Sequence, residues 1–298
     1  MKKTCTWILC VLLASFLIAC SSSSSKPEST SSDTAKEKTE EKKEEKVSVK
    51  DFSQVIVENE NIKFEITGIE PDGIMSYDWK VYLENNTDKT LMYAIEDASI
   101  NGTVCTPVFA TTVAPGKKSN DTVSWLKSLL KDSHIEDVTA VEFHLRVYDS
   151  DDWSADALVD EVFTVYPMGE ENAEYVVFEQ KDSDQVLFDN EYCRMIVTGS
   201  EEGSIYGYNM KVYLENKTDH TMMFAVDESS INGFMCEPFW ATSIPAHKNK
   251  YDSIGWLKSS LDENGITDIE SVEIRVRVYD FEDFSAGSYV DDYFTVNP

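Results

Sequence analysis

Apolar and polar residues alternate along several short segments of the chain. From Tyr77 to Leu83 every second side chain is apolar, with Asp, Lys and Tyr between them. The same period of two recurs in residues 62–66, 91–95, 141–147 and 163–165. A period of two is typical of a β-strand with one face buried. The pattern therefore predicts a fold built from short, half-buried strands.

The whole pattern occurs twice. Residues 80–88 return as residues 211–219, an offset of 211 − 80 = 131 positions, and the match continues without a gap through both copies. A repeat of this length exceeds the roughly 20–50 residues of a solenoid unit and has the size of a domain that folds alone. We therefore predict two copies of one domain, over residues 51–167 and 186–298, joined by a linker over residues 168–185.

Turn and helix signals complete the predicted domain. Asn-Gly pairs at 101–102 and 232–233 favour a type I′ hairpin turn, because both central residues of that turn need a positive φ. Only residues 124–131 and their copy 255–263 show a helical pattern. We expect Tyr175–Phe178 of the linker to add an edge strand or to pack between the domains. The predicted fold class is all-β, with two tandem immunoglobulin-like antiparallel β-sandwich domains that each carry one short helix.

The N-terminus carries the features of an export signal. Two lysines precede an apolar run from Thr6 to Ile18, which suits the core of a signal peptide and is short for a membrane span. The run ends in Leu17-Ile18-Ala19-Cys20, which resembles the lipobox of bacterial lipoproteins. That resemblance implies removal of residues 1–19 and transfer of a diacylglyceryl group to the Cys20 thiol. An ordinary signal peptide or an N-terminal anchor helix is the alternative.

The segment that follows predicts a disordered tether over residues 20–50. It is rich in Ser, Thr, Lys and Glu and has almost no apolar side chain with which to bury a core. The expected location is therefore the outer face of the cell membrane, with the membrane as a partner through the N-terminal lipid.

Signal, tether and repeats together resemble the tandem immunoglobulin-like lipoproteins of Gram-positive, Firmicutes-type bacteria. The lipobox carries this resemblance, together with the Lys-Val-Tyr-Leu-Glu-Asn block at 80–85 and the Arg-Val-Tyr-Asp blocks at 146–149 and 277–280. The last two blocks mark the repeat and imply no activity.

Charge and duplication exclude several classes of function. The net charge is −29, and such a surface repels nucleic acid. A site that both domains need should occur in both copies, yet no histidine does. We therefore expect no catalytic residue, no cofactor and no enzymatic activity. The histidines without an equivalent are His134, His144, His220 and His247.

Three cysteines fall within the repeats and allow two interpretations. Cys105 and Cys236 occupy equivalent positions, whereas Cys193 occurs in the second copy only. A Cys193–Cys236 disulfide would leave Cys105 free. The alternative is buried thiols that act as small hydrophobic side chains, which the sparse cysteine usage favours.

An acidic cluster follows each Arg-Val-Tyr block and suggests a weak Ca²⁺ hypothesis. Closely spaced oxygen ligands are what Ca²⁺ requires, although the spacing is not that of an EF-hand and a charge run is usually a solvated loop. The candidate ligands are Asp149, Asp151, Asp152, Asp160, Asp280, Glu282, Asp283 and Asp291.

Recurring aromatic residues allow a glycan platform, with core packing as the alternative. These pairs are Trp125/Trp256, Trp153/Phe284 and Phe109/Trp240.

Outward-facing residues that both copies keep are the better sign of binding. Inward positions of a strand are explained by the core, whereas outward positions usually vary, unless cross-strand pairing holds them. The possible ligand face comprises Lys80, Tyr82, Glu84, Arg146, Tyr148, Lys211, Tyr213, Glu215, Arg277 and Tyr279. The expected function is a lipid-anchored extracellular binding or adhesion protein without catalysis, whose partner is a protein or a glycan. The alternative is a cell-wall or glycan-binding module, or an accessory subunit of an envelope or transport complex.

Overall fold

The computed structural model describes residues 49–204, 207–283 and 285–298. The predicted signal peptide, Cys20 and nearly all of the predicted tether lie outside the described residues, so these predictions stay predictions. Residues 46–298 form one compact unit. Among the described residues, no helix has the length and apolar character needed to cross a membrane.

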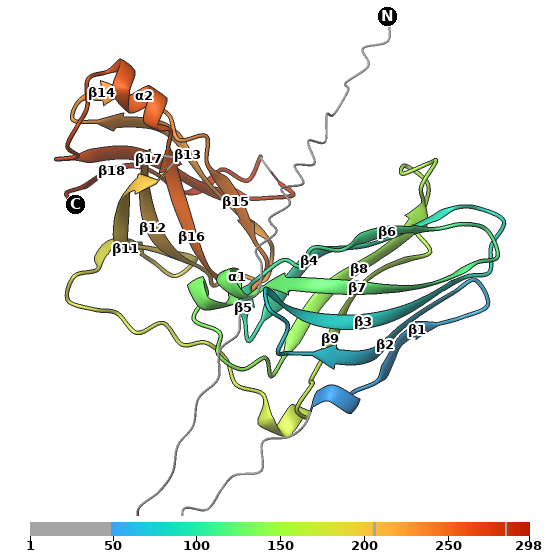
Figure 1. Ribbon diagram of the computed structural model, residues 1–298. Helices are drawn as coiled ribbons and strands as arrows, with labels where there is room; N and C mark the ends of the chain where they lie inside the picture. Colours follow the sequence, from blue (N-terminus) through green and yellow to red (C-terminus); the bar gives the residue numbers. More distant parts are fainter. Residues whose placement is uncertain (1–48, 205–206, 284) are drawn as a thin grey trace, which may run out of the picture. The chain divides into compact units, whose positions relative to one another are not determined.

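The first repeat is a sandwich of two antiparallel sheets (Figure 1). One sheet has the strand order β1-β2-β3-β7, and in the other β4 pairs with β8 on one side and with β5 and β6 on the other, while β9 pairs with β8. The chain crosses between the sheets after β3, β6 and β7. The strands are β1 Gln54–Glu58, β2 Ile62–Glu70, β3 Ser76–Asn85, β4 Leu91–Ile100, β5 Thr103–Val104, β6 Ala110–Val113, β7 Lys118–Leu126, β8 Val141–Asp149 and β9 Val159–Val165.

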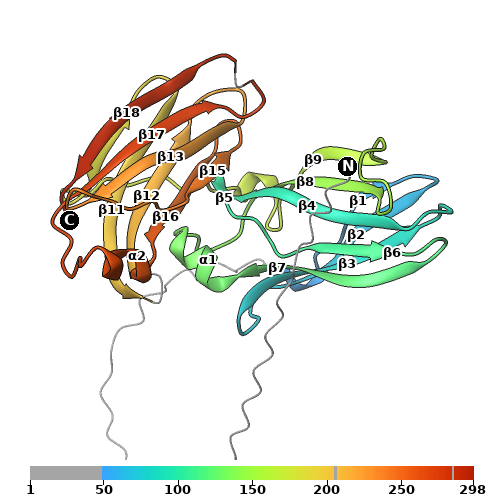
Figure 2. The same cartoon turned by 90° about the horizontal axis from the view of Figure 1, so that it is seen from above.

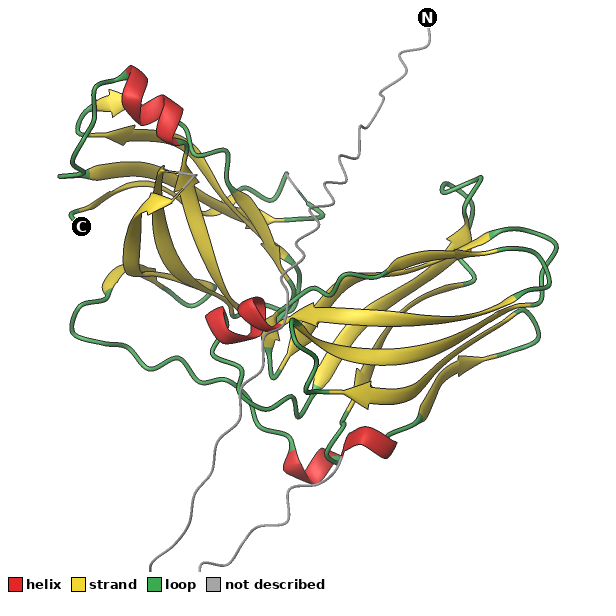
Figure 3. Cartoon of the chain, in the orientation of Figure 1, coloured by secondary structure: helices red, strands yellow, loops and turns green. Residues whose placement is uncertain are grey.

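The second repeat has the same strand order. One sheet runs β10-β11-β12-β16, and a parallel bridge between Asn249 of β16 and Thr103 of β5 joins it to the β4 sheet of the first repeat. In the other sheet β13 pairs with β14, β15 and β17, with β18 beyond β17. Figure 2 shows β13, β17 and β18 side by side, and Figure 3 shows that strands are the main regular structure of both repeats, with a few short helices. The predicted fold class is therefore confirmed. The strands are β10 Gln185–Asp189, β11 Cys193–Ser204, β12 Gly207–Asn216, β13 Met222–Ile231, β14 Phe234–Met235, β15 Ala241–Ile244, β16 Asn249–Trp256, β17 Val272–Asp280 and β18 Ser288–Val296.

The helices begin three residues later than the sequence pattern predicts. Trp125 lies near the end of strand β7 and Trp256 at the end of strand β16, not on a helix. Both side chains are fully buried. Each indole N–H donates a hydrogen bond of 2.9 Å to a backbone carbonyl, that of Cys105 or of Cys236. The strand therefore continues until its tryptophan is in the core. The described helical segments are η1 Val49–Asp51, α1 Lys127–Asp132, η2 Glu170–Asn172 and α2 Lys258–Glu263.

Aromatic rings from both sheets fill the first core. Trp79 of β3 contacts Trp125 of β7 in an edge arrangement with ring centroids 4.8 Å apart. Trp79 also meets Phe143 of the opposite sheet at 5.6 Å. Such pairs contribute about 0.5–1.5 kcal/mol beyond the area that they bury. The contact across the sandwich shows that the inward residues of both sheets share one core.

Both Asn-Gly pairs form the predicted turns, and the asparagines do more than turn the chain. Asn101 and Asn232 have φ values of 52° and 51°, and the following glycines both have 82°. The Asn101 side chain accepts from the Thr139 and Ala140 N–H groups and donates to the Asp137 carbonyl. The second copy repeats this set of bonds from Asn232. Each asparagine therefore ties its hairpin to the segment before the next long strand.

The Asn-x-Thr segments are anchored in the same way. Asn85 and Asn216 are 0% and 1% exposed. The Asn85 amide donates to the carbonyls of Lys89 and Val113 at 2.7 Å, and its carbonyl accepts from the Thr87 N–H and hydroxyl groups. Asn216 makes the same bonds in its own repeat. Turn chemistry is therefore only part of their role, because each amide also bridges two loops from the inside.

The linker does not form the predicted edge strand. Residues 173–180 have no regular secondary structure. Val176 packs against the first core and donates its N–H to the Asn101 carbonyl at 2.9 Å. Phe178 stacks on Tyr213 of β12, with ring centroids 4.1 Å apart and planes 19° apart. Side-chain packing, not strand pairing, therefore holds this segment.

Candidate ligand-binding faces

The predicted ligand face consists of two faces on opposite sides of each sandwich. In the first repeat, Lys80, Tyr82 and Glu84 lie on β3, whereas Arg146 and Tyr148 lie on β8 of the other sheet. Because the inward residues of the two sheets share one core, their outward residues point in opposite directions. We name the β3 set and its copy Lys211, Tyr213 and Glu215 the Lys-Tyr-Glu face. We name Arg146, Tyr148, Arg277 and Tyr279 the Arg-Tyr face.

In the first repeat, cross-strand contacts occupy the Lys-Tyr-Glu face. Lys80 pairs with Glu70 at 3.1 Å, and Lys118 of β7 pairs with Glu84 at 2.7 Å. The Tyr82 hydroxyl donates to the Glu84 carboxylate, and the Lys118 amine lies 5.7 Å from the Tyr82 ring centre. The bonds from Lys118 and then Tyr82 lower the pKa of Glu84. These contacts explain on structural grounds why the three residues recur.

In the second repeat, the linker covers the middle of the Lys-Tyr-Glu face. Tyr213 is only 4% exposed, because Phe178 stacks on it and Tyr251 packs beside it at 5.2 Å. Burial raises the pKa of its hydroxyl. The expectation that Tyr213 is exposed is therefore wrong. The sequence pattern could not show this, since the covering ring comes from the linker, outside the alternation of the strands.

The Arg-Tyr face has the same geometry in both repeats. The Arg146 guanidinium carbon lies 4.8 Å from the Tyr148 ring centre, and Arg277 lies 4.8 Å from the Tyr279 ring. A guanidinium over a tyrosine ring is a favourable cation–π arrangement. All four side chains are partly exposed at the outer surface of their sheet. The predicted outward placement is therefore seen in both copies, while ligand binding at these residues stays a prediction.

Neighbouring strands surround each Arg-Tyr pair with equivalent residues. Met92 of β4 lies opposite Tyr148, Ala94 lies opposite Arg146, and Asp160 of β9 lies on the other side of Arg146. The same neighbours recur around the second pair as Met223, Ala225 and Asp291. Sequence reasoning missed the methionines and alanines, because their placement beside the pair depends on strand register. Their recurrence at the 131-residue offset is the signal that could have found them.

Carboxylates flank both arginines. Arg146 pairs with Glu96 at 3.3 Å and lies 3.7 Å from Asp160. Arg277 pairs with Asp227 at 2.9 Å. These partners are themselves partly exposed, so each guanidinium is oriented but not enclosed. Each face thus offers an aromatic ring, a thioether, an oriented cation and an acidic rim.

The two copies of the Arg-Tyr face differ at one residue position near the arginine. In the first repeat, His144 contacts Asp160 at 2.5 Å. In the second, Arg275 replaces the histidine and binds Asp291 at 2.8 Å and Glu228 at 3.0 Å. The Arg275 bond lowers the pKa of Asp291. The second face is therefore the more highly charged of the two.

The candidate calcium ligands are divided between the end of one strand with its following loop and a neighbouring strand. Asp149 pairs with Lys89 at 2.8 Å and accepts the Asp151 N–H, and Asp280 accepts the Glu282 N–H. Asp160 and Asp291 lie on β9 and β18 beside arginines instead. Across residues 49–298, apart from the three left undescribed, no group of three or more His, Cys, Asp or Glu side chains could hold a metal ion. The calcium hypothesis gains no support from this arrangement.

The remaining candidates are mostly buried. Trp125 and Trp256 belong to the cores and cannot form a glycan platform, and Phe109 is 8% exposed. Trp153, at 74% exposed, is the candidate aromatic most open to solvent, while Phe284 lies outside the described residues. Of the described candidate aromatics, Trp125, Trp256 and Phe109 are therefore buried, and Trp153 is open to solvent.

The described cysteines are free, buried thiols, which confirms the second interpretation of their spacing. Burial raises the pKa of Cys105 and of Cys193 to about 12. Their thiols therefore stay protonated and inert at neutral pH.

Comparison with models of protein families finds no match. Comparison with curated proteins finds no relative of similar sequence.

Comparison with solved structures finds distant immunoglobulin-like β-sandwich proteins. The SafA pilin with the SafB chaperone from Salmonella enterica aligns at a TM-score of 0.22 and 9% identity, over 81% of this chain and 98% of that one. The CsuC–CsuE chaperone–adhesion subunit complex from Acinetobacter baumannii aligns at 0.22 and 12%, over 73% and 90%.

A larger protein aligns equally distantly. The exo-chitosanase CsxA of Amycolatopsis orientalis gives a TM-score of 0.24 and 13% identity over 80% of this chain, and the chain spans 27% of the length of that enzyme. Likenesses this distant do not bear on activity or partners.

Proposed function

We propose that the protein is a lipid-anchored, extracellular binding or adhesion protein without catalytic activity. Its lipobox-like sequence and low-complexity tether resemble those of Gram-positive, Firmicutes-type lipoproteins with tandem immunoglobulin-like domains. In this proposal, Cys20 holds the chain at the outer face of the cell membrane, and the two β-sandwich domains present binding surfaces beyond it.

The duplicated Arg-Tyr face is the observation that carries this proposal. Tyr, Arg and Met are enriched in protein interfaces, and Arg and Tyr are frequent at the residues that dominate binding energy. Packing does not require a guanidinium on a tyrosine ring at the outer surface, yet both repeats keep it at 4.8 Å with the same neighbours. The Lys-Tyr-Glu face lacks this support. In the first repeat its side chains pair with neighbouring residues of the same sheet, and in the second repeat the linker covers Tyr213.

A direct test compares the two faces. Residues 46–298 are immobilised and probed with a glycan array, purified cell-wall fragments and a panel of extracellular host and bacterial proteins. The double variant R146E/R277E reverses charge on the Arg-Tyr face, and K80E/K211E reverses the same number of charges on the opposite sheets. We expect a ligand that is lost with R146E/R277E and retained with K80E/K211E. The reverse pattern, or loss in neither variant, contradicts the assignment.

The alternative is a cell-wall or glycan-binding module, or an accessory subunit of an envelope or transport complex. Exposed Trp153 favours the glycan version, because sugars stack on open aromatic rings. A cell-wall ligand that is lost with Trp153→Ala and retained with R146E/R277E would select it.

The proposed anchor has its own test. Cells that express the whole chain are fed labelled palmitate, and the label is expected on the protein and absent from the Cys20→Ser variant. Label that persists in Cys20→Ser would show that another residue is modified.

A further inference from the structure

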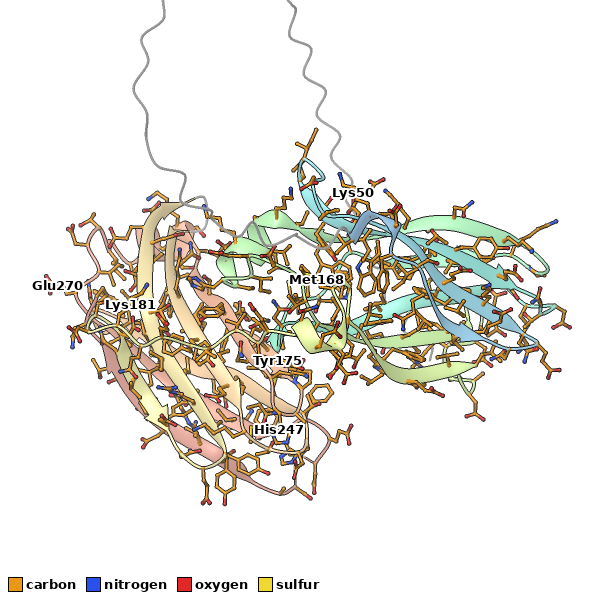
Figure 4. All side chains as sticks on the ribbon, turned by 90° about the horizontal axis from the view of Figure 1, so that it is seen from below. Lys50, Met168, Tyr175, Lys181, His247 and Glu270 are labelled. Carbon is orange, nitrogen blue, oxygen red and sulfur yellow. The ribbon has the colours of Figure 1, made fainter. Side chains whose placement is uncertain are left out.

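A cavity of about 870 Å³ opens at one end of the first repeat, where η1, α1 and the loop after α1 meet. Its volume falls within the roughly 300–1,000 Å³ typical of small-molecule sites. Buried Leu130, Ile135 and Val138 supply apolar surface to it. Figure 4 labels two further lining residues, Lys50 of η1 and Met168. No residue of the Arg-Tyr face lines this cavity, so it is a separate site.

A buried hydroxyl group without a hydrogen-bond acceptor borders the cavity. Tyr77 lines it and is only 5% exposed. The indole N–H of Trp79 lies beside its hydroxyl and can only donate to the hydroxyl oxygen, so the hydroxyl proton has no acceptor among the described residues. Leaving such groups unpaired in a core is costly, and most buried polar groups in folded proteins do find a partner. A polar group of a bound molecule would supply the partner that Tyr77 lacks.

Two cations at the mouth also lack a carboxylate partner. Lys127 and Lys131 lie one helical turn apart on α1, and neither forms an ion pair with a described residue. Like charges at this spacing destabilise a helix slightly. The third lysine that lines the cavity, Lys50, pairs with Asp72 at 3.5 Å. The lysines without a described carboxylate partner are therefore the two on α1. Glu136 and Asp137 also line the cavity. Its lining therefore includes negative charge after α1 as well as the positive charge on α1.

The second repeat lacks this charge pattern. Its helix α2 carries Lys258 at the position of Lys127, but Asp262 replaces Lys131. Lys258 and Asp262 pair with each other at 2.7 Å. Tyr208, which corresponds to Tyr77, is also buried, with Ser200 beside its hydroxyl. The tyrosine is therefore common to the fold, and the paired lysines are specific to the first repeat.

We propose that this cavity binds a small amphipathic molecule that carries an anionic group and a second hydrogen-bonding group. Lys127 and Lys131 bind the anion at the mouth. Leu130, Ile135 and Val138 contact its apolar body, and the Tyr77 hydroxyl bonds the second polar group. Only the first repeat has this site, because in the second repeat Asp262 neutralises the equivalent lysine.

An NMR titration of residues 46–298, the compact folded unit, tests the site with three related probes. 3-(4-Hydroxyphenyl)propionate has the anion, the ring and the second polar group. 3-Phenylpropionate lacks the hydroxyl, and tyramine replaces the anion with an ammonium. We expect saturable shifts among the cavity-lining residues with the first probe, weaker binding of the second and no saturation with tyramine. Absence of saturation with the first probe, or equal binding of tyramine, overturns the proposal.

Variants then separate the roles of the residues. Lys131→Asp copies the ion pair of the second repeat and should weaken binding of the first probe at least tenfold. Lys117→Asp makes the same charge change at an exposed residue outside the cavity and should leave binding unchanged. Tyr77→Phe should remove the preference for the hydroxylated probe while the protein stays folded. Equal weakening by Lys131→Asp and Lys117→Asp, or a preference that survives Tyr77→Phe, contradicts the assignment.

Discussion

Single residues decide more of this fold than its alternating pattern suggests. The sequence marks Asn85 and Asn216 as turn residues, and the strands do end there. It does not show that both amides are buried and donate to two carbonyls at Asn85 and three at Asn216. That information depends on β6 and β15, which approach from elsewhere in the chain. Local pattern therefore predicted the turn, and only tertiary structure could reveal the anchor.

Replacing Asn85 or Asn216 with Ala should destabilise its repeat by about 1–3 kcal/mol, because buried carbonyls lose their donor. Urea denaturation monitored by tryptophan fluorescence measures the change. Asp88→Ala, three residues further along on an exposed side chain, is the matched control and should stay within about 0.5 kcal/mol of the parent. Equal effects of the two substitutions would contradict the buried role of the amide.

The two tyrosines of the Lys-Tyr-Glu face should behave differently despite their equivalent positions. Tyr213 is covered by Phe178, so Tyr213→Ala should cost about 2–4 kcal/mol of unfolding free energy. Tyr82 is partly exposed, and Tyr82→Ala should cost less than about 1 kcal/mol. Phe178→Ala should destabilise in the same direction as Tyr213→Ala. Similar costs for the two tyrosines would mean that the linker does not cover the second face in solution.

At the scale of strands and helices, the alternation of apolar residues predicted the long strands well. It failed at Trp125 and Trp256, where a helical pattern and a strand pattern overlap, and burial of the indole decided for the strand. For Tyr175–Phe178 it left two alternatives, and packing against the two domains is the one that the structure shows, not an edge strand. Alternation of apolar residues shows that one face of a segment is buried, but it does not show which part of the chain covers that face.

The pairing of β17 with β18 predicts an acid-sensitive second repeat. Arg275 lowers the pKa of Asp291, and the bonds from Tyr293 and then Arg275 lower that of Glu228. A carboxylate with a lowered folded-state pKa contributes stability that is present above its unfolded pKa of about 4 and is lost as the pH falls through the folded value.

Substituting Arg275 therefore has a pH-dependent effect. Arg275→Gln should lower the melting temperature near pH 7, and the difference should shrink as the pH falls and both carboxylates become protonated. Scanning calorimetry between pH 7 and 2 measures the difference. Arg194→Gln, which breaks a partly exposed pair with Asp189 in the other sheet, is the comparison variant. A difference from the parent that stays constant with pH would show that the pairing with Asp291 and Glu228 does not supply the effect.

At the scale of the whole molecule, duplication preserved the fold and allowed parts of the surface to diverge. The strand order, the asparagine anchors and the Arg-Tyr pairs are the same in both repeats. The linker covers the tyrosine of the Lys-Tyr-Glu face only in the second repeat, at Tyr213. Two lysines without a carboxylate partner among the described residues occur on the helix only in the first repeat. Comparing the copies position by position could find residues kept by both. It could not find the cavity, whose lining joins segments distant in the sequence.

If both Arg-Tyr faces bind the same class of ligand, the tandem arrangement should give avidity. On a surface that displays many copies of the ligand, the second contact forms at the effective concentration set by the first. R146E or R277E alone should then reduce apparent affinity by roughly 10²–10⁴, to that of a single face, whereas the double variant should not bind. For monovalent ligand in solution, each single variant should only halve the number of sites. Surface plasmon resonance with the ligand immobilised and then free distinguishes these outcomes. One single variant that binds the dense surface as well as the parent, while the other loses binding, would mean that only one face is in use.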